Sequence, residues 1–290
     1  MKRLIVTADD FGRCLPINEA VEDAHVNGIL TAASLMVTGD AVDDAVERAR
    51  RLPGLSVGLH VTLVDGRPAL PPAVIPDLVE ADGRFTHRLV ALGTLIYLDR
   101  RVRRQVTAEL RAQFERFRAT GLPLGHIDAH HHYHLHPTVF DLVLELAVEF
   151  GVPAIRVPWE PPLISWRAHR DGAGRRLANG LFHLRRAQRM RRRARKAGLI
   201  TNDRVFGVND SGAMDVQRLG AFLAALPDGL SEVYCHPATR GWDERPMPPR
   251  YRCVDEYQAL ISPQIGHQIR RHGIRLTSFA LEAASQRTEA

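Results

Sequence analysis

Four short segments of the sequence place aspartate or histidine directly after an apolar run, where a strand is predicted to end. They are Ala8-Asp9-Asp10-Phe11-Gly12, Gly58-Leu59-His60, His126 to His134, and Tyr234-Cys235-His236-Pro237. Two imidazoles and one carboxylate can hold a catalytic divalent metal while leaving coordination positions open for water and substrate. Because the four segments are spread over more than two hundred residues, the pattern predicts one site assembled from several strand ends.

Asp9 and Asp10 are adjacent at the first of these strand ends, so their side chains should point in different directions. One carboxylate could then ligate the metal while the other acts as a base on water. The two residues alone leave open which does which. An acidic pair before Phe-Gly is also common turn chemistry, so the interpretation depends on the other three segments.

The histidine-rich segment offers more candidate ligands than one metal needs. Five of its residues alternate along the sequence: His126, Asp128, His130, His132 and His134. An extended backbone would present them on one face and turn His131 away. Asp128 is a candidate for orienting a ligand imidazole through the second ring nitrogen, and His132 and His134 are interpreted as supporting or substrate-facing groups. A solvated histidine tract is less consistent with a run that begins inside an apolar strand.

His236 follows an apolar run and precedes Pro237, which helps to end the strand. A histidine that faces the site without ligating the metal can act as a general acid near neutral pH. His60 taken alone would more often be structural, and it gains significance only beside the other segments. Cys235 lies within the apolar run without an evident base partner, so we interpret it as a packing residue.

The chain alternates between apolar runs rich in β-forming residues and amphipathic helical stretches. Strands are predicted over residues 4–8, 32–37, 55–59, 123–127, 153–157, 205–208, 232–235 and 274–278. Helices are predicted over 16–27, 42–52 with Asp40 as N-cap, a long stretch ending near 119, 139–150, 216–226 and 254–271. The alternation indicates an α/β fold with a parallel sheet and helical crossovers. About eight strands, with site residues on the first, third, fourth and seventh, favour a (β/α) barrel, incomplete or distorted, over an open doubly wound sheet.

Length and composition fit a single domain over residues 1–290 with a sizeable core, since 45% of the residues are hydrophobic and 25% are charged. The three cysteines, Cys14, Cys235 and Cys253, form no CxxC pair, which argues against a disulfide framework and favours the reducing cytoplasm. The N-terminal apolar run meets acidic residues too early for a signal peptide. The longest apolar stretch, Leu89 to Leu98, is too short to span a bilayer.

Positive charge is concentrated in one segment. Residues 167–196 contain eleven arginines and one lysine against one aspartate, whereas the whole chain has a net charge of +6. The segment interrupts the strand–helix alternation and predicts a basic helical insertion at about 160–203. Five of its arginines are candidates for contact with a membrane or partner: Arg185, Arg186, Arg189, Arg192 and Arg193. One alternative is a solvated helix whose small apolar stripe packs on the barrel or on the partner in a homo-oligomer. Another is a nucleic-acid site, which the near absence of aromatic residues for base stacking in this segment disfavours.

At these residues the chain resembles the YdjC/ChbG-like carbohydrate deacetylases. The resemblance is carried by Thr-Ala-Asp-Asp-Phe-Gly, Gly-Leu-His, His-Ile-Asp-Ala-His-His-His and Cys-His-Pro-Ala, which occur in the family's order and cover nearly the whole chain. It implies a (β/α)-barrel hydrolase that removes the acetyl group from N-acetylated amino sugars with Mg²⁺ or Zn²⁺. It also implies that the metal ligands are Asp10, His60 and His130, with Asp9 as base and His236 as acid.

A narrower resemblance, to the hopanoid-biosynthesis branch of this family, rests on three further stretches: Pro68 to Pro72 with Ile75 to Val79, Leu135 to Thr138, and Phe206 to Gly212. It implies an N-acetylglucosaminyl group on a hopanoid lipid as substrate, and a cytoplasmic enzyme that contacts the inner face of the membrane peripherally. A chito-oligosaccharide is the alternative substrate.

Two alternative functions belong to other classes of protein. One is a two-histidine, one-carboxylate iron oxygenase, which would leave Asp9 without a role, and the other is a membrane-bound adaptor with a structural metal.

Overall fold

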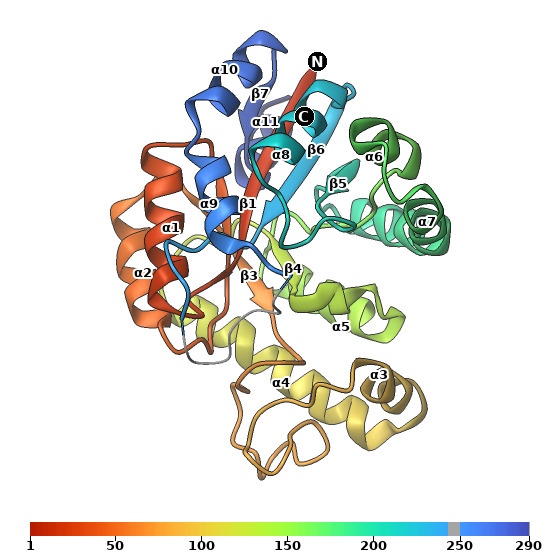
Figure 1. The fold of residues 1–290 in the computed structure, drawn as a ribbon. Coiled ribbons are helices and arrows are strands. Elements are labelled where there is room, and N and C mark those ends of the chain that lie inside the picture. Colours follow the sequence, from red (N-terminus) through yellow and green to blue (C-terminus); the bar gives the residue numbers. More distant parts are fainter. Residues whose placement is uncertain (243–249, 290) are drawn as a thin grey trace.

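The computed structural model describes residues 1–242 and 250–289, in which strands and helices alternate (Figure 1). The strands are β1 (Lys2–Phe11), β2 (Ala32–Leu35), β3 (Ser56–Val61), β4 (Ile127–Ala129), β5 (Arg204–Phe206), β6 (Gly229–Cys235) and β7 (Arg275–Thr277). The helices are α1 (Leu15–Val26), α2 (Val42–Arg51), α3 (Leu89–Leu98), α4 (Arg100–Ala119), α5 (Pro137–Glu149), α6 (Pro162–His169), α7 (Ala173–Lys196), α8 (Val216–Ala225), α9 (Cys253–Leu260), α10 (Pro263–Arg271) and α11 (Phe279–Glu289). A 3-10 helix, η1 (His130–Leu135), follows β4 directly.

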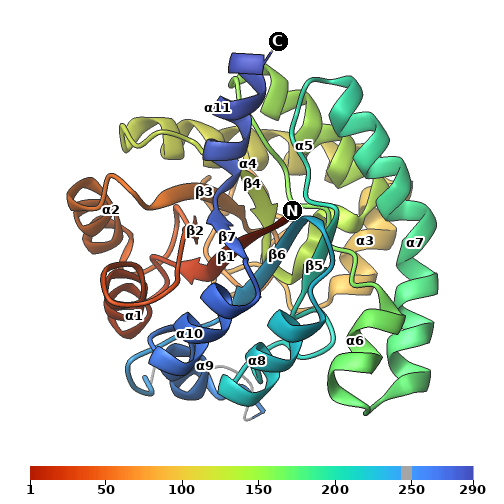
Figure 2. The same cartoon turned by 90° about the horizontal axis from the view of Figure 1, so that it is seen from above.

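The described strands form one parallel, curved sheet in the order β4-β3-β2-β1-β6-β5, and β7 pairs with the first part of β1. Single parallel bridges, Ile127 to Ile155 and Ala154 to Ile200, span the region between β4 and β5. Helices surround the strands when the molecule is seen from above (Figure 2). The predicted α/β barrel is therefore confirmed in its incomplete, distorted form.

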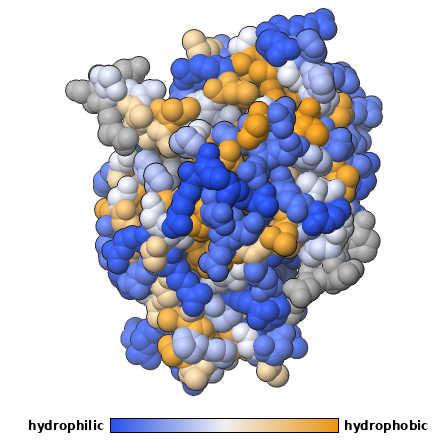
Figure 3. Space-filling view, turned by 90° about the vertical axis from the view of Figure 1, so that its left-hand side faces the viewer, coloured by the Kyte–Doolittle hydropathy of each residue, from blue (hydrophilic) through white to orange (hydrophobic). Residues whose placement is uncertain are grey.

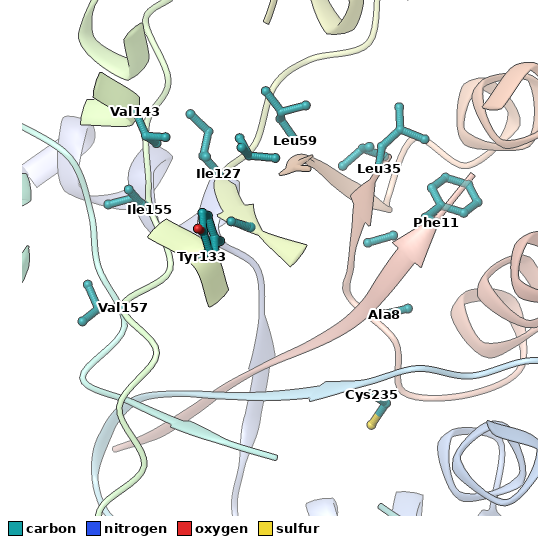
Figure 4. Close-up of a cluster of buried hydrophobic side chains, with 14 of the residues drawn as sticks. Ala8, Phe11, Leu35, Leu59, Ile127, Tyr133, Val143, Ile155, Val157 and Cys235 are labelled. Carbon is teal, nitrogen blue, oxygen red and sulfur yellow. The ribbon is translucent and has the colours of Figure 1, made fainter. Parts of the chain in front are cut away.

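The core is organised around β1, the central strand. Leu4, Ile5 and Val6 are fully buried, as expected for a parallel strand that is covered on both faces. On the neighbouring strands Leu35, Leu59 and Ile127 continue the buried layer (Figure 4). Because all the strands are parallel, the carboxyl ends of β1, β3, β4 and β6 emerge at the same end of the barrel, where the four predicted segments lie.

Two predicted helices are each divided in two. The long helix ending near residue 119 is α3 followed by α4, because Asp99 leaves the helical conformation and caps α4 by accepting a hydrogen bond from the Arg101 amide at 2.6 Å. The helix predicted over 254–271 is α9 followed by α10, which begins at Pro263. Asp40 is not the N-cap of α2, since Ala41 occupies that position without a side-chain cap.

The strand predicted over 153–157 is also wrong, because only Ala154 and Ile155 form bridges there. Pro153 and Pro158 flank this segment, and proline supplies no amide donor to a sheet ladder. At the C-terminus the sequence patterns did not predict α11. Phe279 of this helix is fully buried in a small cluster with Ile5.

The basic segment forms α6 and α7, within the predicted insertion. Three residues of the small apolar stripe on α7 are buried, namely Ala187, Met190 and Ala194. The stripe therefore packs against the rest of the protein, which agrees with the alternative of a solvated helix that packs on the barrel. Arg185, Arg189 and several further arginines are exposed. Among the described residues, no helix has both the length and the apolar content needed to cross a membrane.

Gly58→Ala should destabilise the fold, because β3 passes close to His126 at this position. A Cβ atom on Gly58 would lie 2.4 Å from His126 Cε1, and both residues are buried. Overpacking of this kind lowers the free energy of unfolding by about 1–3 kcal/mol, which urea denaturation can measure. Gly174→Ala is the control, since no atom lies within 4 Å of the added Cβ. Equal stability of Gly58→Ala and the wild type would contradict the expected clash.

Candidate metal and catalytic site

The carboxyl ends of β1, β3, β4 and β6 meet at an open cavity of about 660 Å³. Four of the predicted metal and catalytic residues line it: Asp9, His60, His130 and His236. The fifth, Asp10, is fully buried beside His60 and His130. The structure thus brings these five residues together from strands that are far apart in the sequence.

Asp10, His60 and His130 place three potential ligand atoms beside one another. Asp10 Oδ1 lies 3.0 Å from His130 Nδ1 and 3.4 Å from His60 Nε2. This buried oxygen nevertheless accepts no well-aligned hydrogen bond from the described residues. Buried polar atoms in proteins are rarely left without a partner, and a divalent cation would satisfy all three atoms at once. The donor set therefore fits a metal ion.

The backbone of β1 separates the two adjacent aspartates. Asp10 has a φ of 64°, in the left-handed region, and the pairing of β1 with β2 shifts register between Ala8 and Phe11. This conformation costs a non-glycine residue about 1–2 kcal/mol. Asp10 faces the two histidines, and Arg13 donates a hydrogen bond to its second oxygen at 2.9 Å. Asp9 faces a different cation, Arg156.

Asp128 orients His60. Its Oδ1 accepts a hydrogen bond from His60 Nδ1 at 2.7 Å, and His60 Nε2 faces Asp10. Its Oδ2 accepts a hydrogen bond from Ser34 Oγ at 2.8 Å. Burial alone would lower the pKa of His60, but Asp128, Asp10 and Asp9 raise it to about 10. The carboxylates around this imidazole therefore stabilise positive charge in this part of the site.

Arg156 is a central residue that the sequence patterns did not identify. It is fully buried, and its two terminal nitrogens donate hydrogen bonds to the two oxygens of Asp9 at 2.8 Å each. The same guanidinium contacts Asp128 at 2.6 Å and Glu232 at 2.9 Å. Burial would lower the pKa of Arg156, yet these three carboxylates raise it well above the usual value. The available signal was a lone arginine inside the apolar run 152–157.

The histidine-rich segment is not extended, so the predicted common face is wrong. The strand ends at Ala129, and His131 and His132 in η1 have φ values of 53° and 51°. These left-handed residues turn the chain sharply. Consequently His131, predicted to face away, lines the cavity, with its Nε2 2.9 Å from Asp65 Oδ2.

The turn also separates the two histidines that were predicted to be supporting or substrate-facing. His132 lines the cavity, and its ring centroid lies 4.9 Å from that of Tyr234. His134 is fully buried, with its Nε2 2.9 Å from the carbonyl oxygen of Arg156. Burial lowers the pKa of His134 to about 4. A neutral His134 therefore supports the Arg156 backbone, while His132 belongs to the cavity wall.

His236 contributes to the cavity from the end of β6. Its backbone amide donates a hydrogen bond to Glu256 Oε2 at 2.5 Å, which anchors this end of the strand. Its ring packs against Tyr251 at a centroid distance of 5.1 Å, and its Nδ1 has no hydrogen-bond partner among the described residues. Cys235 beside it is fully buried, and burial raises the pKa of its thiol well above the usual value, consistent with a packing residue.

Comparison with protein families shows a match over most of the chain. Residues 3–271 match the family described as YdjC-like protein. The chain is 31% identical over 280 residues to a carbohydrate deacetylase of Geobacillus stearothermophilus, a match that covers 95% of this chain and 96% of the relative.

Two further relatives match over a shorter part. A carbohydrate deacetylase of Brevibacillus brevis is 41% identical over 157 residues, which are 54% of this chain and 60% of the relative. A chitooligosaccharide deacetylase of Yersinia pestis is 36% identical over 156 residues, which are 52% of this chain and 58% of the relative. These two matches therefore span little more than half the length of the relatives concerned.

Among solved structures, the chain is similar to a candidate cellobiose-phosphate cleavage protein from Enterococcus faecalis V583. The TM-score is 0.73 at 24% sequence identity, and the match covers 96% of this chain and 97% of the other. At this identity the comparison concerns the fold alone. It supports the distorted (β/α)-barrel architecture over nearly the whole chain.

Arg156→Met should destabilise the protein strongly, because it leaves three buried carboxylates without their common cation. Removing one partner from a buried ion pair costs about 3–5 kcal/mol, which should appear as a lower free energy of unfolding in urea. Arg192→Met is the matched control, since Arg192 is exposed on α7, and it should change stability by no more than about 0.5 kcal/mol. Similar stabilities of the two variants would show that Arg156 does not balance this charge.

Proposed function

Since the chain belongs to the YdjC-like protein family, we propose that it is a carbohydrate deacetylase, a hydrolase that removes the acetyl group from an N-acetylated amino sugar. The Geobacillus carbohydrate deacetylase, similar over 95% of this chain, supports this activity. The observation that carries the proposal is the convergence of Asp10, His60 and His130 beside Asp9 at an open cavity.

The proposed cofactor is a divalent metal ion, Mg²⁺ or Zn²⁺, held by Asp10, His60 and His130. When bound there, the ion would polarise the acetyl carbonyl group and acidify a water molecule. Two imidazoles and one carboxylate are a known type of ligand set for catalytic Zn²⁺, whereas Mg²⁺ usually retains several waters and takes oxygen ligands. The buried Asp10 oxygen without an aligned hydrogen bond supports this assignment.

Asp9 is the proposed general base and His236 the proposed general acid. The two hydrogen bonds from Arg156 fix both carboxylate oxygens of Asp9 and so limit its rotation. Asp9 would accept the proton of the attacking water. His236 would donate a proton to the sugar nitrogen as the bond between that nitrogen and the acetyl carbon breaks, which releases acetate and a free amino sugar.

Two classes of substrate follow from the resemblance and the relatives. One is an N-acetylglucosaminyl group on a hopanoid lipid, and the other is a chito-oligosaccharide, which the Yersinia relative favours. A cavity of about 660 Å³ lies within the usual size range of small-ligand sites, so the lipid or the remaining sugars would extend beyond it. The exposed arginines of α7 are a proposed contact with an anionic membrane or a partner.

Asp9→Asn should abolish turnover while the metal content stays near that of the wild type, because Asp9 is proposed to accept a proton and not to ligate the metal. Loss of a general base typically lowers the rate by about 10²–10⁴-fold. Acetate release and metal content per chain are the measurements. Asp10→Asn is the matched comparison and should lose both activity and metal. Retained activity in Asp9→Asn would refute the role of Asp9 as base.

Acetate release from an N-acetylglucosaminyl hopanoid and from diacetylchitobiose should identify the substrate. The hopanoid-linked sugar is expected to react faster if the resemblance to the hopanoid branch is functional. A chelator should remove the activity and added Mg²⁺ or Zn²⁺ should restore it, because the proposed ligands leave open positions for water and substrate. Failure of the metal-loaded protein to release acetate from either compound would contradict the proposed activity on both substrate classes.

A further inference from the structure

α3 is a short helix without a charged residue that exposes one apolar side. Leu92 and Ile96 pack inward, whereas Val90 is 84% exposed, Leu98 73% and Tyr97 63%. The helix lies at the outer edge of the molecule beside α4 (Figure 1). By contrast, the face formed by α1 and α2 is mostly hydrophilic, with hydrophobic residues in small groups (Figure 3). An exposed apolar helix of this kind commonly marks an interaction surface.

Exposed arginines flank α3 at both ends. Arg88 precedes its first residue, and Arg100 and Arg104 lie in the first turns of α4 immediately after it. None of these three side chains forms an ion pair with another described residue. The acidic residue between the helices, Asp99, caps α4. An apolar surface bordered by cationic side chains is complementary to an anionic lipid interface, where apolar groups enter the acyl region and arginines meet headgroups.

α3 is connected directly to the rim of the cavity. His87, two residues before the helix, lines the cavity. Leu89, the first residue of α3, accepts a hydrogen bond from the Tyr133 hydroxyl at 2.9 Å, and Tyr133 belongs to the η1 segment that carries His130. The first residues of α3 are therefore close to the rim of the cavity, and a bilayer bound at this helix would lie near that rim.

Other occupants fit this surface less well. α3 has 10 residues, about half the length needed to span a bilayer. A two-fold contact between copies through α3 would bring the same surface, with its bordering arginines, against itself, and like charges in close contact are unfavourable. If α3 faced only solvent, its large apolar side chains would stay exposed to water, which is unfavourable. An anionic bilayer would bury the apolar side of α3 and attract the bordering arginines to its headgroups.

We propose that α3, with Arg88, Arg100 and Arg104, is a membrane-binding surface that lies in the interface of an anionic bilayer beside the cavity. This surface is distinct from the arginines of α7. It acts by burying Val90, Tyr97 and Leu98 in the interface. If the proposed deacetylase activity is correct, the surface would present a sugar attached to a membrane lipid to the cavity, a consequence that rests on that proposed function.

The test is co-sedimentation of the whole protein with vesicles, without substrate, so that its outcome does not depend on enzymatic activity. Vesicles of phosphatidylcholine alone are compared with a phosphatidylcholine–phosphatidylglycerol mixture. The wild type should bind the anionic mixture, more weakly as salt is raised. Val90→Glu/Leu98→Glu should reduce binding by at least about tenfold, because both apolar contacts are replaced by charges that anionic lipid repels.

Three controls make the result specific. Val26→Glu/Val148→Glu places the same two charges on exposed valines at the ends of α1 and α5 and should bind like the wild type. Arg185→Glu/Arg189→Glu on α7 should retain most of the binding, because the apolar side chains of α3 are proposed to enter the bilayer and the α7 arginines would add only a secondary electrostatic contact. Circular dichroism should show that every variant is folded. The proposal is overturned if the wild type does not bind anionic vesicles, if only the α7 variant loses binding, or if the α3 variant merely converts a dimer into a monomer in sedimentation velocity.

Discussion

The site depends on the balance of buried charge around Arg156. Carboxylates from three strands, Asp9, Asp128 and Glu232, converge on this single guanidinium. Without it, their mutual repulsion and the cost of removing them from water would oppose the packing of β1 against β6 and the approach of β4 to both. One cation thus connects the strands of the barrel at the end where the cavity opens. The same contact fixes the orientation of Asp9.

A second constraint acts at the end of β1, where two neighbouring carboxylates must serve different partners. A regular strand would turn Asp9 and Asp10 to opposite faces of the sheet. The positive φ at Asp10 and the irregular pairing with β2 instead keep both near the cavity. The local strain is tolerated because Arg13, His130 and Arg156 hold the two side chains in place.

The strand–helix alternation was sufficient to predict the barrel and the meeting of the four segments, because the carboxyl ends of parallel strands lie at one side; the choice of Asp10, His60 and His130 among their residues came from the family resemblance. The sequence patterns did not predict Arg156, since a single charged residue has no periodicity and its partners are distant in the sequence. The His131–His132 turn was missed because positive φ values are uncommon outside glycine, so two consecutive histidines give little local signal for such a turn. The break at Asp99 had a local signal, a capping residue, which the surrounding helix-forming residues obscured.

Asp128 illustrates how closely the parts of the site are coupled. It contacts His60, Ser34 and Arg156 at once, although it does not line the cavity. Exchange of this one side chain would alter both the tautomer of a proposed metal ligand and the cation that holds Asp9. The proposed metal binding and the proposed role of Asp9 as a base therefore cannot be changed separately through Asp128. A substitution at Asp128 would need matching changes at His60, Ser34 and Arg156 to leave both groups in place.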